Sequence, residues 1–392
     1  MKVAFIGNMN NNHFAMMRYF RDLGIDAYLF KFANELDHFL PECDTYEYAK
    51  WAPYVIETKI INGDYKQYLK LKSSELYDLY SGYDFYIGNG FSPAYFHKAG
   101  LKLDLFLPYS VGIEYTYKNL SKNILDKIKE KLISRSQING IKNSVRILGT
   151  VDAKTYEKAI LLGVNTKKIA IPMVYNRSTI TNNSEYINEF IAQINNYSFK
   201  VFSHVSHFPY DSLAYKIKRN DILINAFAKY IKSNPTHDSL LILFDYGRNV
   251  KGSKNMIAEL GISKNVLWLP KLERKEIMSI IEHIDLGAGE FGGYFWGGTG
   301  WEFLSKGKLF FQYVDMTNEK IEENTQMAVP PFLNTSDSDF IATKIQYFYN
   351  QRQELKDISA KILDWFDENA GLSLAKKYFD LIQNELKGQK IN

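Results

Sequence analysis

The feature of the sequence that most constrains the fold is a repeated alternation of short apolar segments with helix-like segments. Lys2–Gly7 is a short apolar run that ends at glycine, Phe14–Leu23 carries apolar residues at helical spacing, and Ile25–Phe30 is apolar again. A strand–helix–strand rhythm of this kind is typical of a parallel sheet covered by helices. The rhythm stops in a polar, asparagine-rich stretch, residues 176–197, and restarts at Phe199–His204. The sequence therefore predicts an α/β protein with two doubly wound halves.

The length of 392 residues is enough for two domains with separate cores. We expect an N-terminal domain over 1–177, a linker over 178–198, a second domain over 199–366, and a C-terminal helix over 367–392 that packs back towards the N-terminal domain. The loop after the first predicted strand lacks the G-x-G-x-x-G spacing, so the sequence does not predict a dinucleotide site there.

Composition argues against several classes of protein. The net charge of +4 is too small to indicate nucleic acid as a partner, and the single cysteine, Cys43, excludes a disulfide framework. The first residues, MKVAFIGNMN, contain too short an apolar run for a signal peptide, and no stretch is apolar for long enough to form a transmembrane helix. We therefore expect a cytoplasmic protein for which any membrane contact is peripheral.

The densest glycine stretch of the chain, Gly287–Lys308, holds eight glycines, two glutamates and two tryptophans. Glycine lets the backbone approach a ligand closely, and a helix that follows a glycine turn offers free amides and a positive dipole end to a diphosphate. The pattern predicts a turn over Gly297–Gly300 and a helix over Trp301–Lys306. The alternative is a purely structural turn between a strand and a helix.

Residues 118–147 carry eight basic residues and two acidic ones, a surplus larger than the net charge of the whole chain. Within this segment, five apolar residues fall on one face of a predicted helix, Leu120–Ile133: Leu120, Ile124, Leu125, Ile128 and Leu132. Two interpretations remain open. The helix can lie on an anionic membrane surface, or it can be an ordinary amphipathic helix with a solvated basic face.

Two α/β halves with a glutamate-bearing glycine loop late in the second half resemble the GT-B glycosyltransferases. More narrowly, they resemble the large retaining group that carries two glutamates in the donor-binding domain. FSHVSHF…KIKRNDILINAF is similar to that family's strand, phosphate-binding loop and helix, with Lys218 at the place of its donor-phosphate lysine. Glu290-Phe291-Gly292 resembles the first glutamate motif, and Gly300–Lys308 resembles the second. The resemblance implies two Rossmann-like α/β/α domains facing a central cleft.

The same resemblance implies an activity. A sugar moves from a nucleotide-diphosphate donor to a glycan or lipid-linked acceptor, with retention and without a metal or other cofactor, in the synthesis of a cell-surface polysaccharide. The implied catalytic residues are Glu290 and Lys218. The implied donor-binding residues are Arg219, His207, Gly298, Thr299, Gly300, Glu302 and Arg248. In this group, the carboxylate of Glu302 is expected to bind the hydroxyls of the ribose.

On the acceptor side, the candidates come from loops at the carboxyl ends of predicted strands in the first half, because such loops face the ligand in a doubly wound sheet. These candidates are Asn10, Asn11, His13 and Glu114. Asp337-Ser338-Asp339 is the one Asp-x-Asp pair in the sequence. It precedes a predicted helix, so we interpret it as a helix cap and not as a metal site.

The sequence also departs from the family pattern. Eleven residues separate Glu290 from Glu302, more than is usual in the family, and the extra residues around Tyr294–Trp296 are expected to enlarge the sugar-side wall. Arg219 stands where glycine is usual, and Pro108–Gly112 lacks a histidine that the family often carries. Two alternatives therefore stay open, a GT-B sugar-nucleotide epimerase and a non-catalytic nucleotide-sugar-binding protein.

Overall fold

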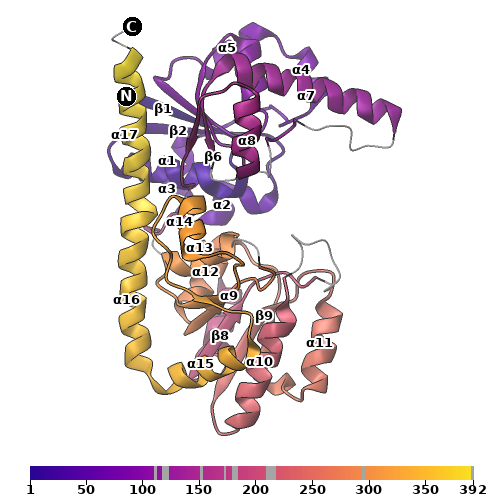
Figure 1. Cartoon of the computed structure of the whole chain (residues 1–392), viewed down its shortest axis with the longest axis vertical. Helices are drawn as coiled ribbons and strands as arrows, with labels where there is room; N and C mark the ends of the chain where they lie inside the picture. The colour runs from indigo at the N-terminus through magenta and orange to yellow at the C-terminus, as the bar shows by residue number, and fades with distance from the viewer. Residues whose placement is uncertain are drawn as a thin grey trace. The chain divides into compact units, whose positions relative to one another are not determined.

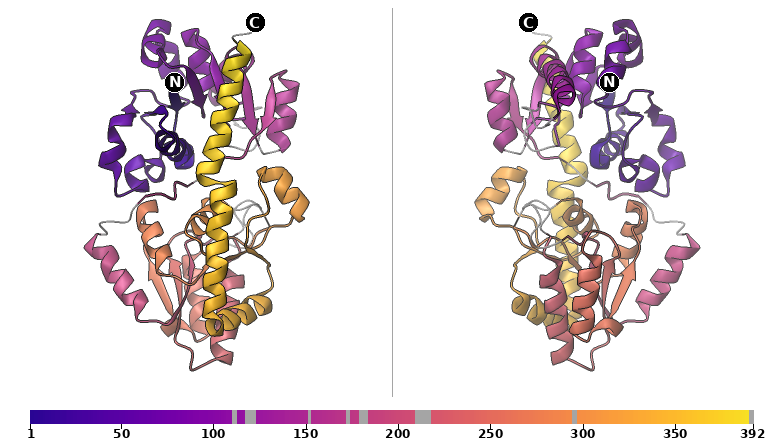
Figure 2. Two further views of the ribbon diagram at one scale, coloured as in Figure 1. Left: turned by 90° about the vertical axis from the view of Figure 1, so that its left-hand side faces the viewer. Right: turned by 90° about the vertical axis from the view of Figure 1, so that its right-hand side faces the viewer.

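A computed structural model describes residues 1–109, 113–116, 123–150, 153–171, 174–178, 184–208, 218–293 and 297–389. The chain divides into two compact units. Unit 1 contains Met1–Tyr175, Glu319–Ala328 and Ala370–Asn392, and unit 2 contains Asn176–Asn318 and Val329–Asn369. Each unit is built around its own parallel sheet with flanking helices (Figures 1 and 2), as the alternating sequence pattern predicts.

Unit 1 contains a seven-stranded sheet in the order β3-β2-β1-β4-β5-β6-β7, and all neighbouring strands are parallel. Its strands are β1 (Lys2–Ile6), β2 (Asp26–Lys31), β3 (Val55–Glu57), β4 (Phe85–Gly88), β5 (Leu103–Phe106), β6 (Val145–Thr150) and β7 (Thr166–Lys168). The central strands are buried on both faces, which explains why they read as continuous apolar runs in the sequence.

Among the described residues, five helices of unit 1 precede β4 in the chain and five follow it. In chain order they are α1 (Asn12–Asp22), α2 (Pro41–Asp44), α3 (Tyr48–Trp51), α4 (Tyr65–Lys70), α5 (Ser73–Tyr80), α6 (Ser92–Ala99), α7 (Ile124–Ser144), α8 (Ala153–Leu161), α14 (Asn318–Thr325) and α17 (Gly371–Gln389). The C-terminal helix α17 contacts α1, and Tyr378 donates a hydrogen bond to the carbonyl of Ala170 (2.7 Å).

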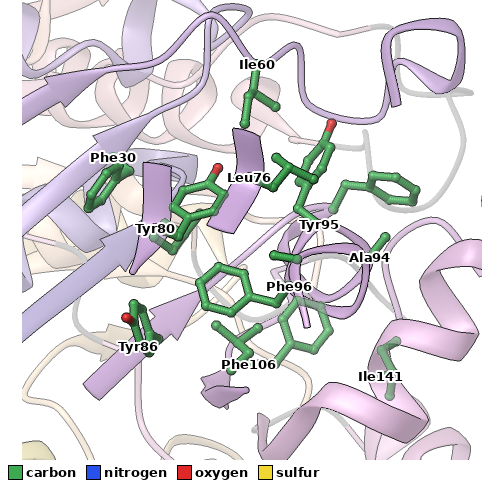
Figure 3. Close-up of a cluster of buried hydrophobic side chains, with 14 of the residues drawn as sticks. Phe30, Ile60, Leu76, Tyr80, Tyr86, Ala94, Tyr95, Phe96, Phe106 and Ile141 are labelled. Carbon is green, nitrogen blue, oxygen red and sulfur yellow. The ribbon is translucent and has the colours of Figure 1, made fainter. Parts of the chain in front are cut away.

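One core of unit 1 is rich in aromatic side chains (Figure 3). Tyr80 stacks on Phe96 with ring centroids 5.1 Å apart, and Phe30 meets Tyr80 edge-on at 5.4 Å. Such pairs add about 0.5–1.5 kcal/mol each to the free energy gained by burying their area. The cluster joins α5 and α6 to β2 and β4, and it fixes that face of the sheet.

Unit 2 contains a six-stranded parallel sheet in the order β10-β9-β8-β11-β12-β13. Its strands are β8 (Phe199–Ser203), β9 (Ser239–Phe244), β10 (Val266–Leu269), β11 (Leu286–Ala288), β12 (Phe310–Gln312) and β13 (Leu333–Asn334). Its helices are α9 (Glu185–Asn195), α10 (Asn220–Ser233), α11 (Val250–Glu259), α12 (Arg274–Glu282), α13 (Gly298–Ser305), α15 (Ser338–Asn350) and α16 (Arg352–Asn369).

Both sheets reverse their strand order beside the first strand of the unit. In unit 1 the reversal lies between β1 and β4, and in unit 2 it lies between β8 and β11. Loops that leave adjacent strands on either side of such a reversal diverge and leave room for a ligand at the carboxyl ends of the strands. The topology therefore marks the loops after β1 and β4, and those after β8 and β11, as the places to examine for function.

The structure refines three local predictions. Helix α13 begins at Gly298, so the predicted turn over Gly297–Gly300 already forms the first helical turn, and the prediction of a helix start at Trp301 was wrong. The amides of this turn have no acceptor within the helix, so they remain free to donate to a ligand, as the predicted diphosphate site requires. The side chain of Asp337 accepts a hydrogen bond from the amide of Asp339 (2.8 Å), which confirms the predicted helix cap.

The basic segment forms helix α7, which begins at Ile124. Leu120, Lys118 and Lys122 lie outside the described residues, as do Tyr294–Trp296 of the glycine stretch. In the described part of the chain, no helix combines the length and the apolar character needed to span a bilayer.

Candidate functional site

Two predicted site residues of unit 2, Lys218 and Glu290, form an ion pair. Lys218 follows the loop after β8, and Glu290 follows β11, the neighbouring strand at the reversal of strand order. The backbone also joins the two loops, since the amide of Phe291 donates to the carbonyl of Lys218 (3.0 Å). The amide of Glu290 is held in turn by Oε1 of Gln312 on β12 (2.9 Å). The sheet topology thus brings together the lysine and the glutamate that the sequence assigns to catalysis.

A second charged group centres on Glu302, which lies in α13 and is buried. Its Oε1 accepts a hydrogen bond from Nε of Arg274 (2.9 Å), and its Oε2 accepts one from Nε2 of His204 (2.7 Å). Arg274 is the first residue of α12, and His204 directly follows β8. One carboxylate therefore ties together the ends of a strand and two helices.

Electrostatics keep the Glu302 carboxylate ionised. Burial alone raises the pKa of Glu302, but the His204 hydrogen bond and the Arg274 charge outweigh burial and lower the pKa to about 2. The His204 ring packs near three phenylalanines, Phe202, Phe244 and Phe303, with centroids 5.3 to 6.0 Å away. This apolar surrounding keeps water from the pair and strengthens the interaction.

The two charged groups meet at the N-terminus of α13. An ideal Cβ built on Gly297 would lie 3.9 Å from Oε1 of Glu290. One built on Gly298 would lie 3.5 Å from Nη2 of Arg274 and 3.7 Å from Oε1 of Glu302. Consecutive glycines therefore border both groups, and any side chain at these positions would enter the space beside them. The amides of the first helical turn open into the same region.

Gly298, Thr299 and Gly300, predicted as donor-binding residues, form this first turn of α13. Gly300 is buried, and Gly298 and Thr299 are half-buried. The predicted cluster at the glycine stretch is therefore assembled by the fold together with Lys218 and Glu290.

Arg219 lies beside this arrangement, but its guanidinium points into a local salt bridge. Nε donates to Oδ1 of Asp221 (2.9 Å), and Nη2 donates to Oδ2 (2.9 Å). The backbone of Arg219 has a φ of 52°, in the left-handed region that glycine prefers, so a glycine would adopt this backbone conformation with less strain. Arg219 also lines a cavity of about 420 Å³ with Ile222, Phe291, Gly292, Tyr313 and Ser336.

The remaining predicted donor residues lie apart from the charged groups. The ring of His207 hydrogen-bonds through Nδ1 to Oγ of Ser253 on α11 (2.8 Å) and packs against Trp268 of β10 at 5.2 Å. Burial lowers the pKa of His207 to about 4. Arg248 is exposed in the loop between β9 and α11. The fold does not bring either residue into the group around α13 through any contact among the described residues.

In unit 1, the loop after β1 is organised by amide side chains. Asn8 donates from Nδ2 to Oδ1 of Asn11 (2.7 Å) and to the carbonyl of Phe39 (2.6 Å), and its Oδ1 caps the amide of Phe14 (2.9 Å). Asn11 in turn donates to the carbonyl of His38 (3.1 Å). Both polar atoms of the Asn11 side chain therefore hold the loop. Asn10 is half-buried and, like Asn11, has a positive φ.

His13 presents an unused nitrogen in the interior of unit 1. Its Nδ1 lies 2.8 Å from the carbonyl of Gly7, so Nδ1 carries the proton and Nε2 is left as an acceptor. Among the described residues, Nε2 has no hydrogen-bond partner although it is buried. Burial lowers the pKa of His13 to about 4, which keeps the ring neutral. The ring packs against Phe5 and Tyr109, with centroids 5.5 and 6.0 Å away.

Glu114, the last acceptor-side candidate, is buried and accepts a hydrogen bond from the amide of Tyr109 (2.9 Å). Tyr109 also packs against the His13 ring, so both candidates contact the same residue in the loop after β5. Within the described residues, no group of three or more His, Cys, Asp or Glu side chains is placed to hold a metal ion.

Neither His204 nor Arg274 is among the site residues that the sequence predicts. His204 was visible as the polar end of an apolar strand run, and Arg274 as a basic residue at the start of a helix that follows Pro270. Neither position indicates a site until the sheet order is known, because the two residues are separated from Glu302 by 98 and 28 positions in the chain.

Comparison with known proteins gives structural matches only. No protein-family model matches the sequence, and no curated protein matches it significantly. HepE from Anabaena, solved in complex with UDP and glucose, is similar over 98% of this chain and 100% of its own, with a TM-score of 0.60 and 15% identity. A glycosyltransferase from Rickettsia africae covers 98% and 99% with a TM-score of 0.56 and 13% identity.

TarM from S. aureus, solved as a mutant with fondaparinux, alpha-GlcNAc-glycerol and UDP, covers 97% of this chain and 100% of its own, with a TM-score of 0.54 and 11% identity. At these identities the likeness concerns the fold. The likeness extends over both units. It agrees with the presence of two parallel sheets in this chain, whose strand orders match each other over six strands. The chain therefore has the GT-B fold, in which two Rossmann-like α/β domains follow one another along one chain.

Proposed function

We propose that the protein is a glycosyltransferase that moves a sugar from a nucleoside-diphosphate donor to a glycan or lipid-linked acceptor. The observation that carries the proposal is the meeting of two charged groups, Lys218–Glu290 and Arg274–Glu302–His204, at the N-terminus of α13. Cations and helix amides that converge on one point match the charge of a diphosphate. The GT-B fold supports the proposal, since the similar solved structures include a glycosyltransferase and proteins with bound UDP.

In this proposal Lys218 and the first amides of α13 bind the diphosphate. The ammonium of Lys218 has three donors, so it can keep Glu290 as a partner and still donate to phosphate oxygens. Negative charge grows on the diphosphate as its bond to the sugar breaks. A fixed cation and amides aimed at that charge stabilise the transition state more than the ground state. No metal is required for this step, and no cofactor is proposed.

Glu290 is proposed to bind a hydroxyl of the donor sugar, and Glu302 to bind the ribose. Glu302 uses one lone pair on each oxygen for Arg274 and His204, and an ionised carboxylate has about four such acceptor positions. Two positions therefore remain for ribose hydroxyls. Arg274 and His204 would hold the carboxylate in one orientation, which makes them positioning residues for the nucleoside.

On the acceptor side, we propose that His13 binds an acceptor hydroxyl through its bare Nε2. The bond between the anomeric carbon and the diphosphate oxygen breaks, and the acceptor oxygen forms the new bond. The proton of the acceptor hydroxyl leaves with the nucleoside diphosphate when the configuration is retained, so no side-chain base is needed. If the configuration is inverted, the neutral imidazole of His13 is the proposed base.

The proposed setting is the synthesis of a cell-surface polysaccharide by a cytoplasmic enzyme. The test is a screen of nucleotide sugars, in which release of nucleoside diphosphate is measured with and without candidate acceptor glycans. Release that depends on an acceptor supports a transferase, and NMR of the product shows whether the configuration is retained. Conversion of the donor to its epimer without an acceptor would identify an epimerase instead. Binding without any product would identify a non-catalytic binding protein.

A further inference from the structure

Helix α7 exposes a stripe of large apolar side chains. Ile124 and Leu125 are 73% and 74% exposed, Ile128 is 52% exposed, and Leu132 is 38% exposed. The sequence predicts these residues on one helical face, which would ordinarily cover a core. In the structure this face turns to solvent. Contiguous exposed apolar side chains are uncommon on soluble proteins and mark a surface that binds something.

The charges on α7 are sorted around this stripe. Successive residues of a helix are about 100° apart, so Ile124, Ile128, Leu132 and Leu125 fall within an arc of roughly 100°. The acidic residues, Asp126 and Glu130, lie on the opposite side of the helix. The exposed lysines lie closer to the stripe and border it on both sides, Lys127 and Lys131 on one side and Lys129 on the other, and Arg135 lies in line with the stripe one turn further along the helix.

The C-terminal half of α7 anchors the helix to unit 1. Gly140 lies so close to α6 that an added Cβ would be 2.3 Å from the carbonyl carbon of Pro93. Gln137 donates to the carbonyl of Gly90 (2.8 Å), and Ile141 is buried. This buried face continues along the helix to the side that carries Asp126 and Glu130. Figure 1 shows the N-terminal half of α7 projecting from the rest of unit 1.

We propose that the N-terminal part of α7, Ile124–Arg135, docks on an anionic lipid surface. An apolar stripe bordered by cations, with its acids on the far side, is the arrangement of a helix that lies in the interface of a bilayer. The apolar side chains enter the acyl boundary while the bordering lysines and the arginine reach anionic headgroups. A protein partner would also cover apolar side chains, but the sorting of charge favours a surface of uniform negative charge. The proposal is independent of the enzymatic function.

Flotation of the full-length protein with vesicles tests the proposal. Vesicles of phosphatidylglycerol mixed with phosphatidylcholine are expected to carry the protein, and binding should fall steeply as salt rises because exposed charges are screened. Vesicles of phosphatidylcholine alone are expected to bind much less. Absence of binding to the anionic vesicles would overturn the proposal.

Variants locate the contact. Ile124→Ser combined with Leu125→Ser should lower vesicle affinity at least about tenfold, because both side chains lose apolar burial. Lys127→Glu combined with Lys131→Glu should remove most of the salt-sensitive binding. Both pairs are exposed, so folding should be unaffected, which circular dichroism can check.

Matched controls come from elsewhere in unit 1. Leu161→Ser removes an apolar side chain that is 85% exposed on α8, and Lys376→Glu with Lys377→Glu reverses two exposed charges on α17. These controls are expected to bind vesicles as the wild type does. Equal losses in the controls and the α7 variants would overturn the proposal. So would sedimentation that shows self-association abolished by the α7 variants, because the stripe would then be a dimer interface.

Discussion

In each unit, the loops at the carboxyl ends of the strands form one side of the sheet, called here its carboxyl edge. The two carboxyl edges share one topology but differ in their electrostatics. In unit 2 the edge is charged: a lysine and a glutamate from loops beside the strand reversal form one pair, and Arg274 and His204 hold Glu302 in a second group. The hydrogen bond from His204 and the charge of Arg274 lower the pKa of Glu302 to about 2 despite its burial. Charge is therefore maintained at this edge.

In unit 1 the equivalent loop is held by neutral groups. Asn8 and Asn11 hydrogen-bond to each other and to carbonyls, and burial keeps His13 uncharged with a pKa of about 4. Burial also raises the pKa of Glu35, which accepts a hydrogen bond from the amide of Asn8 (2.7 Å). Charge is disfavoured at this edge.

One sheet order can thus present surfaces suited to two kinds of ligand. An edge that keeps charge suits an anionic diphosphate, and an edge of amides and a neutral imidazole suits the hydroxyls of a sugar. The proposed assignment of donor to unit 2 and acceptor to unit 1 rests on this difference, and substitutions at the two edges test it.

The largest expected effect is on turnover. Glu290→Gln should lower kcat by about a hundredfold or more, because it removes the carboxylate that pairs with Lys218 and that we propose to bind the donor sugar. His13→Gln should instead raise the KM for the acceptor and change the KM for the donor little. Steady-state kinetics with donor and acceptor varied separately measure both. A donor KM that rises in His13→Gln alone would reverse the assignment of the two edges.

Removal of one partner of the buried group should destabilise unit 2. Arg274→Met leaves the Glu302 carboxylate buried with His204 alone, which we expect to cost about 3 kcal/mol of unfolding free energy. Unfolding in denaturant measures the loss. Lys254→Met is the control, since its pair with Asp245 is exposed and should contribute less than about 1 kcal/mol. An equal loss of unfolding free energy in the two variants would show that burial does not strengthen the interaction of Arg274 with Glu302.

The two edges should respond to acid in different windows. Glu302 and His13 both have a lower pKa in the folded protein than in the unfolded chain. The unfolded chain therefore binds more protons between the two pKa values. Each group contributes its full stability above its unfolded pKa, and this contribution is lost as pH falls to the folded pKa. As pH falls, the free energy of unfolding should decrease by up to about 3 kcal/mol through His13 between about pH 6.5 and 4. It should decrease by a similar amount through Glu302 between about pH 4.5 and 2.

Unfolding free energies of the wild type, Glu302→Gln and His13→Gln against pH measure these windows. Glu302→Gln should flatten the profile below about pH 4.5, and His13→Gln should flatten part of it above about pH 4. Part of the upper window will remain in His13→Gln, because His207 also has a lowered pKa of about 4. Profiles that stay identical to the wild type would contradict the assigned pKa shifts.

The smallest and most selective effect concerns the start of α13. Gly298→Ala should leave the fold as stable or slightly more stable, by less than about 1 kcal/mol, because alanine favours the helix. Its methyl group would nevertheless lie 3.5 Å from Arg274 Nη2 and 3.7 Å from Glu302 Oε1, and would occupy the space beside this charged group. We expect nucleoside-diphosphate affinity to fall about tenfold while thermal stability is kept. Unchanged affinity would move the ligand away from this turn.

Much of the fold follows from the sequence, because buried parallel strands and amphipathic helices leave distinct periodic patterns. Lys2–Gly7 and Phe199–His204 begin the two sheets as predicted. The exposure of the apolar face of α7 could not be predicted from the sequence. A period of 3.6 residues groups Ile124 with Ile128 on one face, but it does not show whether that face packs on a core or faces solvent. Only packing of the other face against α6 decides this.

The candidate site was predictable where a local pattern carries it. The glycine stretch indicates the start of α13, and the family resemblance adds Lys218 and Glu290, which the fold then places in one ion pair. Arg274 and His204 could not be found in this way. They reach Glu302 only because the fold places the end of β8 and the start of α12 beside α13, and the separation along the sequence hides this proximity.

We propose that the charged edge of unit 2 binds the diphosphate of a nucleotide donor. Calorimetric titration of the wild type, Lys218→Ala and Lys229→Ala with a panel of nucleoside diphosphates tests it most directly. Lys229 pairs with Asp339 on the exposed surface of unit 2 and serves as the matched control. We predict that at least one nucleoside diphosphate binds the wild type and Lys229→Ala equally, and Lys218→Ala at least about tenfold more weakly. Equal affinity in Lys218→Ala, or no binding of any member of the panel to the wild type, would contradict the claim.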